Sequence, residues 1–467
     1  MRSHQLRAQI IRHARSGSLD RATALLTEYG EGRSPDDADL CLMLGRILKE
    51  RGKRAEGSAA ADLFLRASER YEQAAGSDQF SYPLINAATL ARLAGKDRRA
   101  EALAARVLDV LDENPDEAET PYWRHATRAE ALLLLGQDVE ARAALASAMA
   151  LAPQAWEDHA VTIGQFTLIC EERGLPTAWL DKHRPPRSLQ FSGIMDIDPK
   201  DEALHRRICE TIASENIGFG FGALAAGADI LIAECLIERG AMLHVVLPCP
   251  RDVFRERSVM AVDPAWGERF DRALEAAASV DELESSSAPD APSVVLADDV
   301  ARGMALQNAN LLQTSACSLR IVAIDEEPPQ QDGSELKAIV LKAARAGGSS
   351  YHVPPAGKLV TLGASKSSGG EVIVQEFDTP AAAMVGITGW IAAGHRVVLD
   401  YRYRPEGADP AEAHSRLGPM LSVGEAGQVL ASKAFAFAML AQRPEATIES
   451  YGEVRSAEGP FDVFLLA

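Results

Sequence analysis

The sequence predicts a multidomain protein with an all-α helical repeat domain, then an α/β domain with a parallel sheet, then an α+β domain. The chain has 467 residues, which at about 150 residues per domain suggests about three domains. Apolar residues recur at helical spacing up to about residue 180, and strands alternate with helices after it. We therefore expect a helical-repeat domain at 1–183, a parallel-sheet domain at 184–327, a linker at 328–335 and an α+β domain at 336–467.

The helical-repeat prediction comes from two similar stretches, 85–110 and 125–151. Each has a helix, a turn that contains glycine (Gly95 or Gly136) and an Ala-rich second helix. Helical hairpins that recur along a chain are typical of tetratricopeptide-like domains. Such stacks usually bind proteins, so we expect a protein partner here.

The two later domains are predicted from their order of elements. In the first, a strand at 188–193 precedes a helix at 202–215, and a strand at 242–248 follows a second, apolar helix. Another helix is expected at 264–284, and a helix at 301–313 and a strand at 319–327 close that domain. The α+β domain is expected to contain strands at 336–343, 370–377, 395–404 and 460–467, a buried helix at 380–394 and a helix near 425–442.

Composition excludes several classes of partner. Lys and Arg number 48 and Asp and Glu 67, so the net charge of −19 repels nucleic acid and anionic lipid. The N-terminus lacks the apolar run of a secretory signal, and the longest uncharged apolar stretch, 380–394, is too short to span a bilayer. We expect a cytoplasmic protein with no nucleic acid and no membrane partner.

Six cysteines lie at 41, 170, 209, 235, 249 and 317, and none forms a CxxC pair. The spacing therefore gives no zinc signature, and we expect no metal site. Most have apolar neighbours, which predicts buried, reduced thiols.

A glycine-rich stretch carries the strongest chemical signal. Gly218, Gly220, Gly222 and Gly227 precede an apolar helix that begins near Asp229. Glycines let backbone approach a phosphate, and a helix N-terminus presents free N–H groups. Close helix–sheet packing that requires small residues is the alternative explanation.

The segments FSGIMDIDP and GFGFGALAAGADILIAECLIERGAMLHVVLPCP resemble the SLOG superfamily over about 188–327. The resemblance implies a Rossmann-like domain that binds a nucleotide-derived ligand. It implies these ligand-binding residues: Ser192, Gly193, Gly220, Gly222, Gly227, Asp229, Glu234, Pro248 and Ser258. Asp229 has an alternative role in complementing the helix dipole, and Glu234 in pairing with a core partner. The chain lacks the PGGxGTxxE pattern of the hydrolases in this group, which favours ligand sensing over hydrolysis.

Three arginines, Arg251, Arg255 and Arg257, follow the strand at 242–248. They have the geometry to hold phosphates, but Asp252 and Glu256 lie between them. We favour a solvated helix face, with at most one arginine on a ligand.

The N-terminal region is similar to the TRAFs-binding helical domain over about 30–183. Tyr82, Asn86, Tyr122 and Trp123 carry this resemblance, and we expect them to serve the core. The resemblance implies docking of a protein and no catalytic role.

The third domain resembles a class III adenylate/guanylate cyclase, a ferredoxin-like α+β fold, over about 336–467. Segments 337–341, 371–380, 394–406 and 427–432 carry the resemblance. Cyclases use two carboxylates to hold metal ions, but Lys342 stands where the first is expected and Glu371 is at best a longer substitute for the second. The transition-state Asn and Arg fall near Ser415 and Pro419, and proline cannot replace a guanidinium. We predict a pseudo-cyclase, retained for dimerisation.

Together these features predict a non-catalytic cytoplasmic signalling or scaffold protein. We expect a nucleotide-derived ligand in the middle domain, no certain cofactor, a protein partner on the helical repeats and a homo-oligomer. The alternatives are a nucleotide-processing enzyme, either a residual cyclase or a hydrolase, and a purely structural self-assembling protein.

Overall fold

A computed structural model describes residues 2–15, 19–76, 80–114, 120–283, 289–327, 336–347, 356–367, 369–409 and 414–466. The chain divides into two compact units, Met1–Pro185 and Pro186–Ala467. The first is helical and the second contains two β-sheets, as the sequence predicts at this level. In the described segments no helix is both long enough and apolar enough to cross a membrane.

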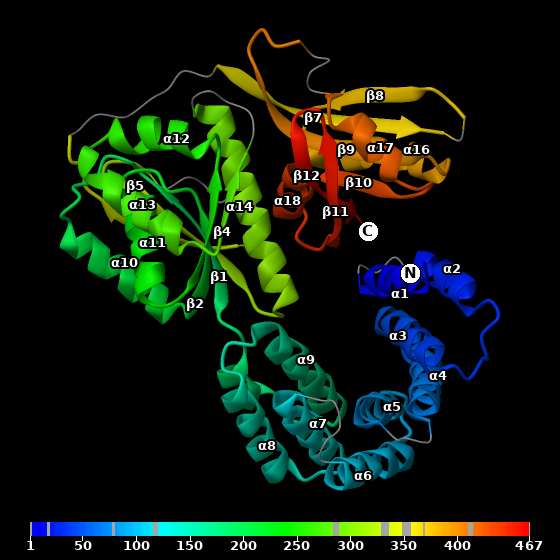
Figure 1. The fold of residues 1–467 in the computed structure, drawn as a ribbon. Helices are drawn as coiled ribbons and strands as arrows, with labels where there is room; N and C mark the ends of the chain where they lie inside the picture. Colours follow the sequence, from blue (N-terminus) through cyan, green and yellow to red (C-terminus); the bar gives the residue numbers. More distant parts are fainter. Residues whose placement is uncertain are drawn as a thin grey trace. The chain divides into compact units, whose positions relative to one another are not determined.

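Unit 1 is a series of antiparallel helical hairpins in which each helix from α1 to α7 packs against the next, and α9 packs against α5 and α7. Helices α3, α5, α7 and α9 lie along the inner side of an arc, and α4, α6 and α8 along its outer side (Figure 1). The helices are α1 (Arg2–Arg15), α2 (Leu19–Gly30), α3 (Ala38–Arg54), α4 (Gly57–Ala75), α5 (Ser81–Leu93), α6 (Asp97–Glu113), α7 (Pro121–Leu134), α8 (Asp138–Leu151) and α9 (Trp156–Glu172), followed by a short 3-10 helix at Ala178–His183. The predicted repeat architecture is confirmed.

Glycines have two different roles in these repeats. Gly95 and Gly136 have φ of 69° and 77°, so they reverse the chain between paired helices at little steric cost. Gly52 lies inside α3, where a Cβ would come 2.6 Å from the Phe64 ring of α4. It therefore permits close packing of α3 against α4.

The first sheet of unit 2 is entirely parallel, with strand order β4-β3-β2-β1-β5-β6. Its strands are β1 (Arg187–Gly193), β2 (Ile217–Gly222), β3 (Met242–Leu247), β4 (Ser279–Glu282), β5 (Ala316–Ala323) and β6 (Lys337–Ala343). Its helices are α10 (Glu202–Ser214), α11 (Ala228–Glu238), α12 (Arg251–Phe254), α13 (Gly267–Ala276) and α14 (Ala291–Leu311), with short π and 3-10 helices at Arg255–Met260 and Pro264–Trp266.

Helices cover both faces of this sheet. A Cβ on Gly220 of β2 would meet Leu236 of α11, so this face is covered by α11. The Oγ of Ser188 on β1 accepts a hydrogen bond from Nδ2 of Asn308 on α14 (3.0 Å). Ser188 pairs across the sheet with Phe219, which is next to Gly220 on β2. Because successive strand residues point to opposite faces, α14 covers the other side.

The second sheet is mixed, with strand order β11-β12-β10-β9-β7-β8. Only β9 and β10 pair in parallel among its described strands. Its elements are β7 (Gly357–Lys366), β8 (Val372–Phe377), α15 (Pro380–Gly386), α16 (Thr388–Ala392), β9 (Arg396–Pro405), α17 (Leu417–Val423), β10 (Val429–Ser432), α18 (Lys433–Gln442), β11 (Ile448–Ser456) and β12 (Gly459–Leu466).

Helix α14 joins the two sheets. It contacts β1, β2 and β3 on one side and α18, β7 and β9 on the other. A Cβ on Gly303 would lie 2.1 Å from the carbonyl oxygen of Phe437, so only glycine lets the backbones of α14 and α18 come this close. At the start of α14, the Asp290 carboxylate accepts hydrogen bonds from the Tyr403 hydroxyl (2.7 Å) and the Ala356 N–H (2.8 Å) of the second sheet region.

The structure corrects several expectations. Strand 337–343 pairs with β5 in the parallel sheet, so it does not open the third domain as the cyclase resemblance implied. Segment 380–394 forms two short, largely exposed helices rather than one buried helix. Cys209 and Cys235 are joined by a disulfide, so the expectation of reduced thiols is wrong for this pair. The predicted linker 328–335 lies outside the described residues.

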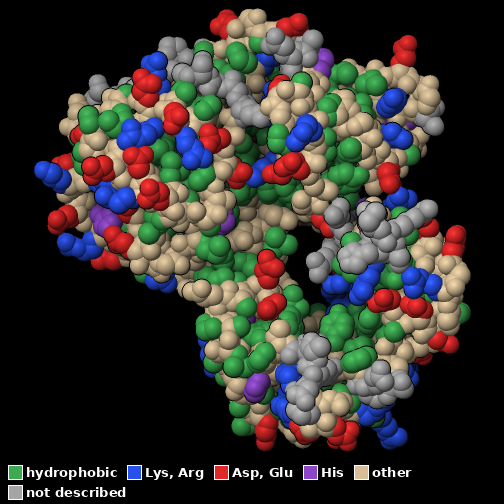
Figure 2. All heavy atoms as spheres, in the orientation of Figure 1, with side chains coloured by type: hydrophobic (Ala, Val, Ile, Leu, Met, Phe, Trp, Pro, Cys, Tyr) green, Lys and Arg blue, Asp and Glu red, His purple; other side chains and the backbone are tan. Residues whose placement is uncertain are grey.

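Acidic and basic side chains are interspersed over the visible face of unit 2 (Figure 2). This mixing agrees with the many ion pairs of its surface, among them Arg251 with Glu282 and Arg255 with Asp271.

We predict that Gly303→Ala lowers the free energy of unfolding by about 1–3 kcal/mol, because the added methyl overpacks the contact between α14 and α18. Urea unfolding measures this. Gly418→Ala is the matched control, since a Cβ at Gly418 of α17 has no heavy atom within 4 Å. It should be neutral or gain up to about 1 kcal/mol. Equal unfolding midpoints for the two variants would contradict the packing role.

Candidate functional site

The carboxyl ends of β1 and β5 form the switch point of the parallel sheet. From β1 the chain proceeds through β2, β3 and β4 on one side, and α14 then returns it to β5 on the other side. Open α/β sheets bind ligands in the crevice at this point. Ser192 and Gly193 end β1, and Ser192 pairs with Arg320 of β5. Ser192 and Gly193, which the sequence predicts as site residues, therefore lie at the sheet position where open α/β folds commonly bind ligands.

Two glycines let the N-terminus of α11 pack tightly against the end of β1. A Cβ on Gly193 would lie 2.4 Å from the Cβ of Ala228. Gly227 has φ of 89°, and a Cβ there would lie 2.4 Å from the Met195 carbonyl oxygen. The Ala228 N–H donates to the Ile194 carbonyl (3.1 Å). Both glycines are thus required by backbone geometry, and one helix N–H already has a protein acceptor.

Asp229 lies in the first turn of α11, and its side chain is buried. Its Oδ2 accepts a hydrogen bond from the Ala225 N–H (3.2 Å), but Oδ1 has no hydrogen-bond partner among the described residues. Burial, with the nearby Asp298 carboxylate, raises the pKa of Asp229 to about 8, although backbone N–H groups of Ala225 and Gly193 oppose the shift. A buried acceptor without a hydrogen-bond donor is rare and energetically unfavourable.

Asp298 of α14 faces the same edge of the sheet. Burial raises the pKa of its carboxyl to about 6, against the opposing charges of Arg320 and Arg302. Neighbouring carboxyl groups whose pKa values are raised by burial, accompanied by arginines, are typical of functional sites. The site therefore combines two acids with arginines from β5 and α14.

The glycines of the stretch 218–222 occupy strand β2 rather than a loop before the helix. A Cβ on Gly220 would lie 2.2 Å from Leu236, and one on Gly222 would lie 2.6 Å from the Phe191 carbonyl oxygen. Phe219 and Phe221 alternate with them on the opposite face. Close packing, the alternative raised by the sequence, accounts for both glycines.

The other predicted residues have separate positions. Glu234 forms a bidentate ion pair with Arg269, whose guanidinium also donates to the Pro199 carbonyl (2.7 Å). These contacts favour the alternative in which Glu234 pairs with a partner in the protein rather than with a ligand. The Ser258 carbonyl accepts from the Ala226 N–H (3.0 Å), which places this buried residue beside the Asp229 turn. Pro248 is buried after β3.

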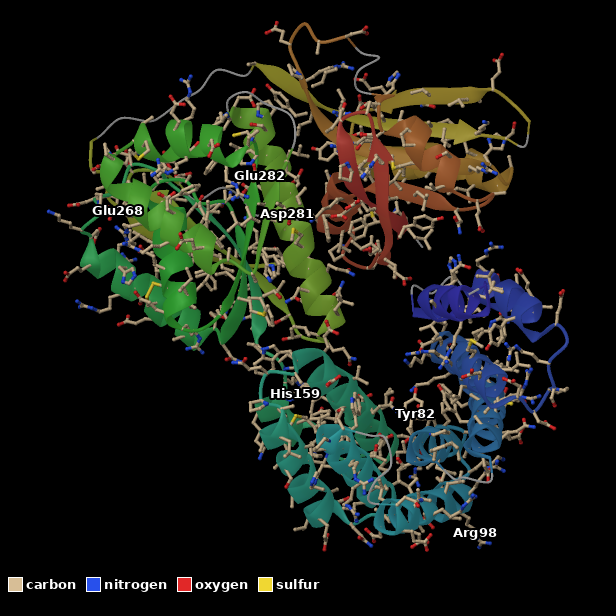
Figure 3. The ribbon with its side chains drawn as sticks, in the orientation of Figure 1. Tyr82, Arg98, His159, Glu268, Asp281 and Glu282 are labelled. Atoms are coloured by element: carbon tan, nitrogen blue, oxygen red, sulfur yellow. A yellow bond between two sulfur atoms is a disulfide. The ribbon has the colours of Figure 1, made fainter. Side chains whose placement is uncertain are left out.

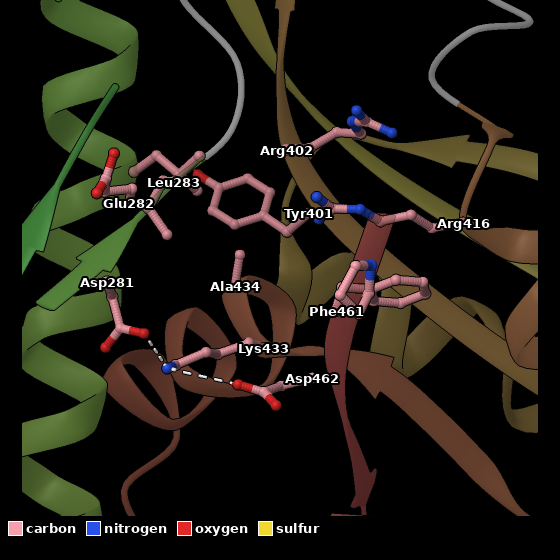
Figure 4. Close-up of a pocket in the computed structure, with 12 residues that line it drawn as sticks. Asp281, Glu282, Leu283, Tyr401, Arg402, Arg416, Lys433, Ala434, Phe461 and Asp462 are labelled. Carbon is pink, nitrogen blue, oxygen red and sulfur yellow. Dashed lines mark hydrogen bonds and ion pairs between the residues drawn. The ribbon is translucent and has the colours of Figure 1, made fainter. Parts of the chain in front are cut away.

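A cavity of about 160 Å³ lies between the end of β4 and the second sheet (Figure 4). Lys433 bridges Asp281 of β4 and Asp462 of β12, with Nζ 3.7 Å from the Asp462 carboxylate. Arg402 donates to Ser415 (3.0 Å) and to Glu458 (3.2 Å). Sequence reasoning did not identify this cavity as a site, because its residues span 281–462 and share no motif.

A polar cluster lies between the inner helices of unit 1. Lys49 of α3 donates from Nζ to Asn86 of α5 and to Gln165 of α9 (both 3.4 Å). Gln165 in turn donates to Glu130 of α7 (3.4 Å). Burial lowers the pKa of Lys49 to about 8 and raises that of Glu130. Four successive hairpins thus contribute one polar side chain each to the inner side of the arc.

The aromatic residues behind the TRAFs-binding resemblance divide into two groups. Tyr122 is buried and shares a hydrogen bond with Thr162 (2.8 Å), and Trp123 packs edge-on against it. Tyr82 is 45% exposed, so the expectation of a core role is wrong for this residue (Figure 3).

Residues 2–91 match the family model described as Tetratricopeptide Repeats-Sensor. The match covers α1 to α4 and most of α5. A comparison with curated proteins gave no match. A helical repeat domain of this kind points to a role in protein interaction or signalling.

We predict that Asp229→Asn flattens the pH dependence of stability. The raised pKa of about 8 means that the protonated carboxyl contributes stability that is complete below the unfolded pKa and is lost as pH rises through about 8. Replacing the carboxyl should remove a slope of about 1 kcal/mol per pH unit between about pH 5 and pH 7. Urea unfolding across this range checks it. The exposed Glu268 of α13 (Figure 3) provides the control variant Glu268→Gln, which should keep the wild-type slope. A wild-type slope in Asp229→Asn would show that this carboxyl is not the titrating group.

Proposed function

We propose that the chain is a non-catalytic signalling or scaffold protein whose parallel-sheet domain binds a nucleotide-derived ligand. The observation that carries this function is the buried Asp229 carboxyl group at the switch point of the sheet, whose Oδ1 has no hydrogen-bond partner among the described residues. Ribose hydroxyl and base amino groups are donors that would satisfy such an oxygen. The resemblance to the SLOG superfamily supports the same ligand class.

The arginines of the site suit the anionic part of a nucleotide. Arg320 lies on β5 directly beside Ser192 of β1, and Arg302 lies one helical turn after Asp298. Guanidinium groups bind phosphate through paired hydrogen bonds. A phosphate near these arginines would also lower the cost of keeping Asp298 protonated, since the two anions repel.

The helical unit would dock a protein partner along its inner side. Lys49, Asn86, Glu130 and Gln165 present both donors and acceptors there, and Tyr82 adds an exposed aromatic ring. Repeat domains use such continuous inner surfaces for binding. The match to a sensor family at 2–91 supports this part of the proposal.

The second sheet would act as a pseudo-cyclase domain that mediates self-association. Strand 337–343 is not part of this domain, because it belongs to the parallel sheet. Strand β8 is at the edge of this sheet, with β7 as its one neighbour among the described strands, and Val372, Ile373 and Val374 on it are exposed. An exposed apolar edge strand can pair with another chain. We assign the partner as a second copy of this chain, because an antiparallel pairing of β8 with itself is self-complementary about a two-fold axis.

We predict that a nucleotide or nucleotide sugar stabilises the full chain in a thermal-shift panel. A ligand at about a hundred times its Kd adds about 2.7 kcal/mol if it binds only the folded state. The shift should disappear in Asp229→Asn and persist in Glu268→Gln. A magnesium-dependent response to ATP or GTP that survives Asp229→Asn would favour the residual-cyclase alternative. Silence across the panel would favour the purely structural alternative.

We predict that Ile373→Lys shifts the chain from dimer to monomer in sedimentation velocity, because a charge on the β8 edge prevents strand pairing. Val139→Lys is the matched control, since Val139 is an exposed valine on α8 of the helical unit. A monomeric wild-type chain, or a dimer that survives Ile373→Lys, would contradict pairing through β8.

A further inference from the structure

Two neighbouring helices on one face of the parallel sheet bring four potential metal ligands together. On α10, Cys209 follows His205 by four residues, and on α11, Glu238 follows Cys235 by three. Residues at these spacings share one side of a helix. Each helix therefore directs two ligand side chains toward the other.

The ligand atoms are already within a few ångströms of one another. The Cys209 sulfur lies 4.0 Å from each ring nitrogen of His205 and 4.0 Å from Glu238 Oε2. His205 Nε2 lies 3.8 Å from Glu238 Oε1. The ligand atoms of His205, Cys209 and Cys235 all lie within 4.8 Å of one another, the one group of three His, Cys, Asp or Glu ligands so placed in the part of the chain that the structure describes.

The chemistry of this set is that of zinc. Zinc prefers thiolate and imidazole ligands in a tetrahedron, completed by a carboxylate or water. Zn–S and Zn–N bonds of about 2.3 and 2.0–2.1 Å place neighbouring ligand atoms about 3.6–3.8 Å apart. The histidine and glutamate separations are close to this. The two sulfurs are bonded to each other in the structure, and their Cα atoms are 5.1 Å apart. They would reach the zinc separation by side-chain rotation once that bond is reduced.

We propose that His205, Cys209, Cys235 and Glu238 bind one zinc ion when the two cysteines are reduced, and that the disulfide is the oxidised, metal-free form of the same site. A peroxide is the oxidant that we assign. The two thiolates lose two electrons and form the S–S bond, while the O–O bond of hydrogen peroxide breaks, takes up two protons and gives two water molecules. Zinc leaves because both sulfur ligands are lost.

The position of the cluster makes it accessible to both zinc and peroxide. Cys209 and His205 are partly exposed and Glu238 is exposed, whereas Cys235 is buried beneath them. In a reducing compartment a disulfide is not retained, so the dithiol form would be available for metal. This site is separate from the proposed ligand site and does not depend on it.

The test is metal binding by the full-length chain, reduced and then freed of reductant without air. Cobalt is the visible probe, because a tetrahedral cobalt–thiolate site absorbs strongly. We expect one equivalent of Co²⁺ to produce this absorption and one equivalent of Zn²⁺ to abolish it. Cys209→Ser should lose the absorption. His205→Ala should weaken zinc binding at least about 10–100-fold, the range found even for outer-shell changes at metal sites. Cys41→Ser, a buried cysteine of the helical unit, should leave binding unchanged.

Three results would overturn the proposal. These are the absence of cobalt absorption in the reduced wild type, absorption that persists in Cys209→Ser, and a loss in Cys41→Ser as large as that in Cys209→Ser. Circular dichroism shows whether each variant folds, and His205→Ala decides the matter if the cysteine variants do not. Peroxide treatment of the zinc-loaded chain should release the zinc and give a Cys209–Cys235 disulfide in peptide mass spectrometry. Zinc that stays bound after peroxide would refute the redox step.

Discussion

The close approach of α14 to α18 at Gly303 is the contact on which the second unit depends. The Phe437 carbonyl occupies the space in which any larger residue would place its Cβ. Because α14 covers one face of the parallel sheet and also touches β7 and β9, its position fixes both sheets at once. The hydrogen bonds from Tyr403 and Ala356 to Asp290 hold its N-terminal end. Hydrogen bonds from these partners keep the pKa of Asp290 below its usual value although burial acts in the opposite direction, so the bonded form is the carboxylate.

The same helix links the candidate site to the second sheet. Asp298, one of the two acids with a raised pKa, and Asp299, which accepts a hydrogen bond from Tyr401 of β9 (3.4 Å), are adjacent on α14. A ligand that neutralises or displaces Asp298 therefore acts on the helix that contacts β9. Coupling between two sites requires an element that both contact, and α14 is such an element. This gives the proposed sensor a physical route from ligand to self-association.

The sequence predicted the helical repeats well, because glycine turns such as Gly95 and the apolar spacing are local signals. It also identified Asp229 and the glycines around it as residues of one region. It did not identify Gly218–Gly222 as a strand, although these glycines alternate with Phe219 and Phe221 at the two-residue period of a strand. Strand 337–343 pairs with β5. The residues of that strand do not by themselves specify which strand it pairs with. Cys209 and Cys235 escaped the search for metal motifs because their helices meet only after folding.

Hydrogen exchange of the full chain, followed by mass spectrometry with and without saturating ATP, ADP or cyclic AMP, tests the central claim most directly. The account predicts that a bound nucleotide slows exchange at 192–196, at 223–230 and in the N-terminal half of α14, where the acids and glycines of the site lie. Slowed exchange in the helical unit alone, or at the cavity around Lys433 without change at 223–230, would place the ligand elsewhere and contradict it.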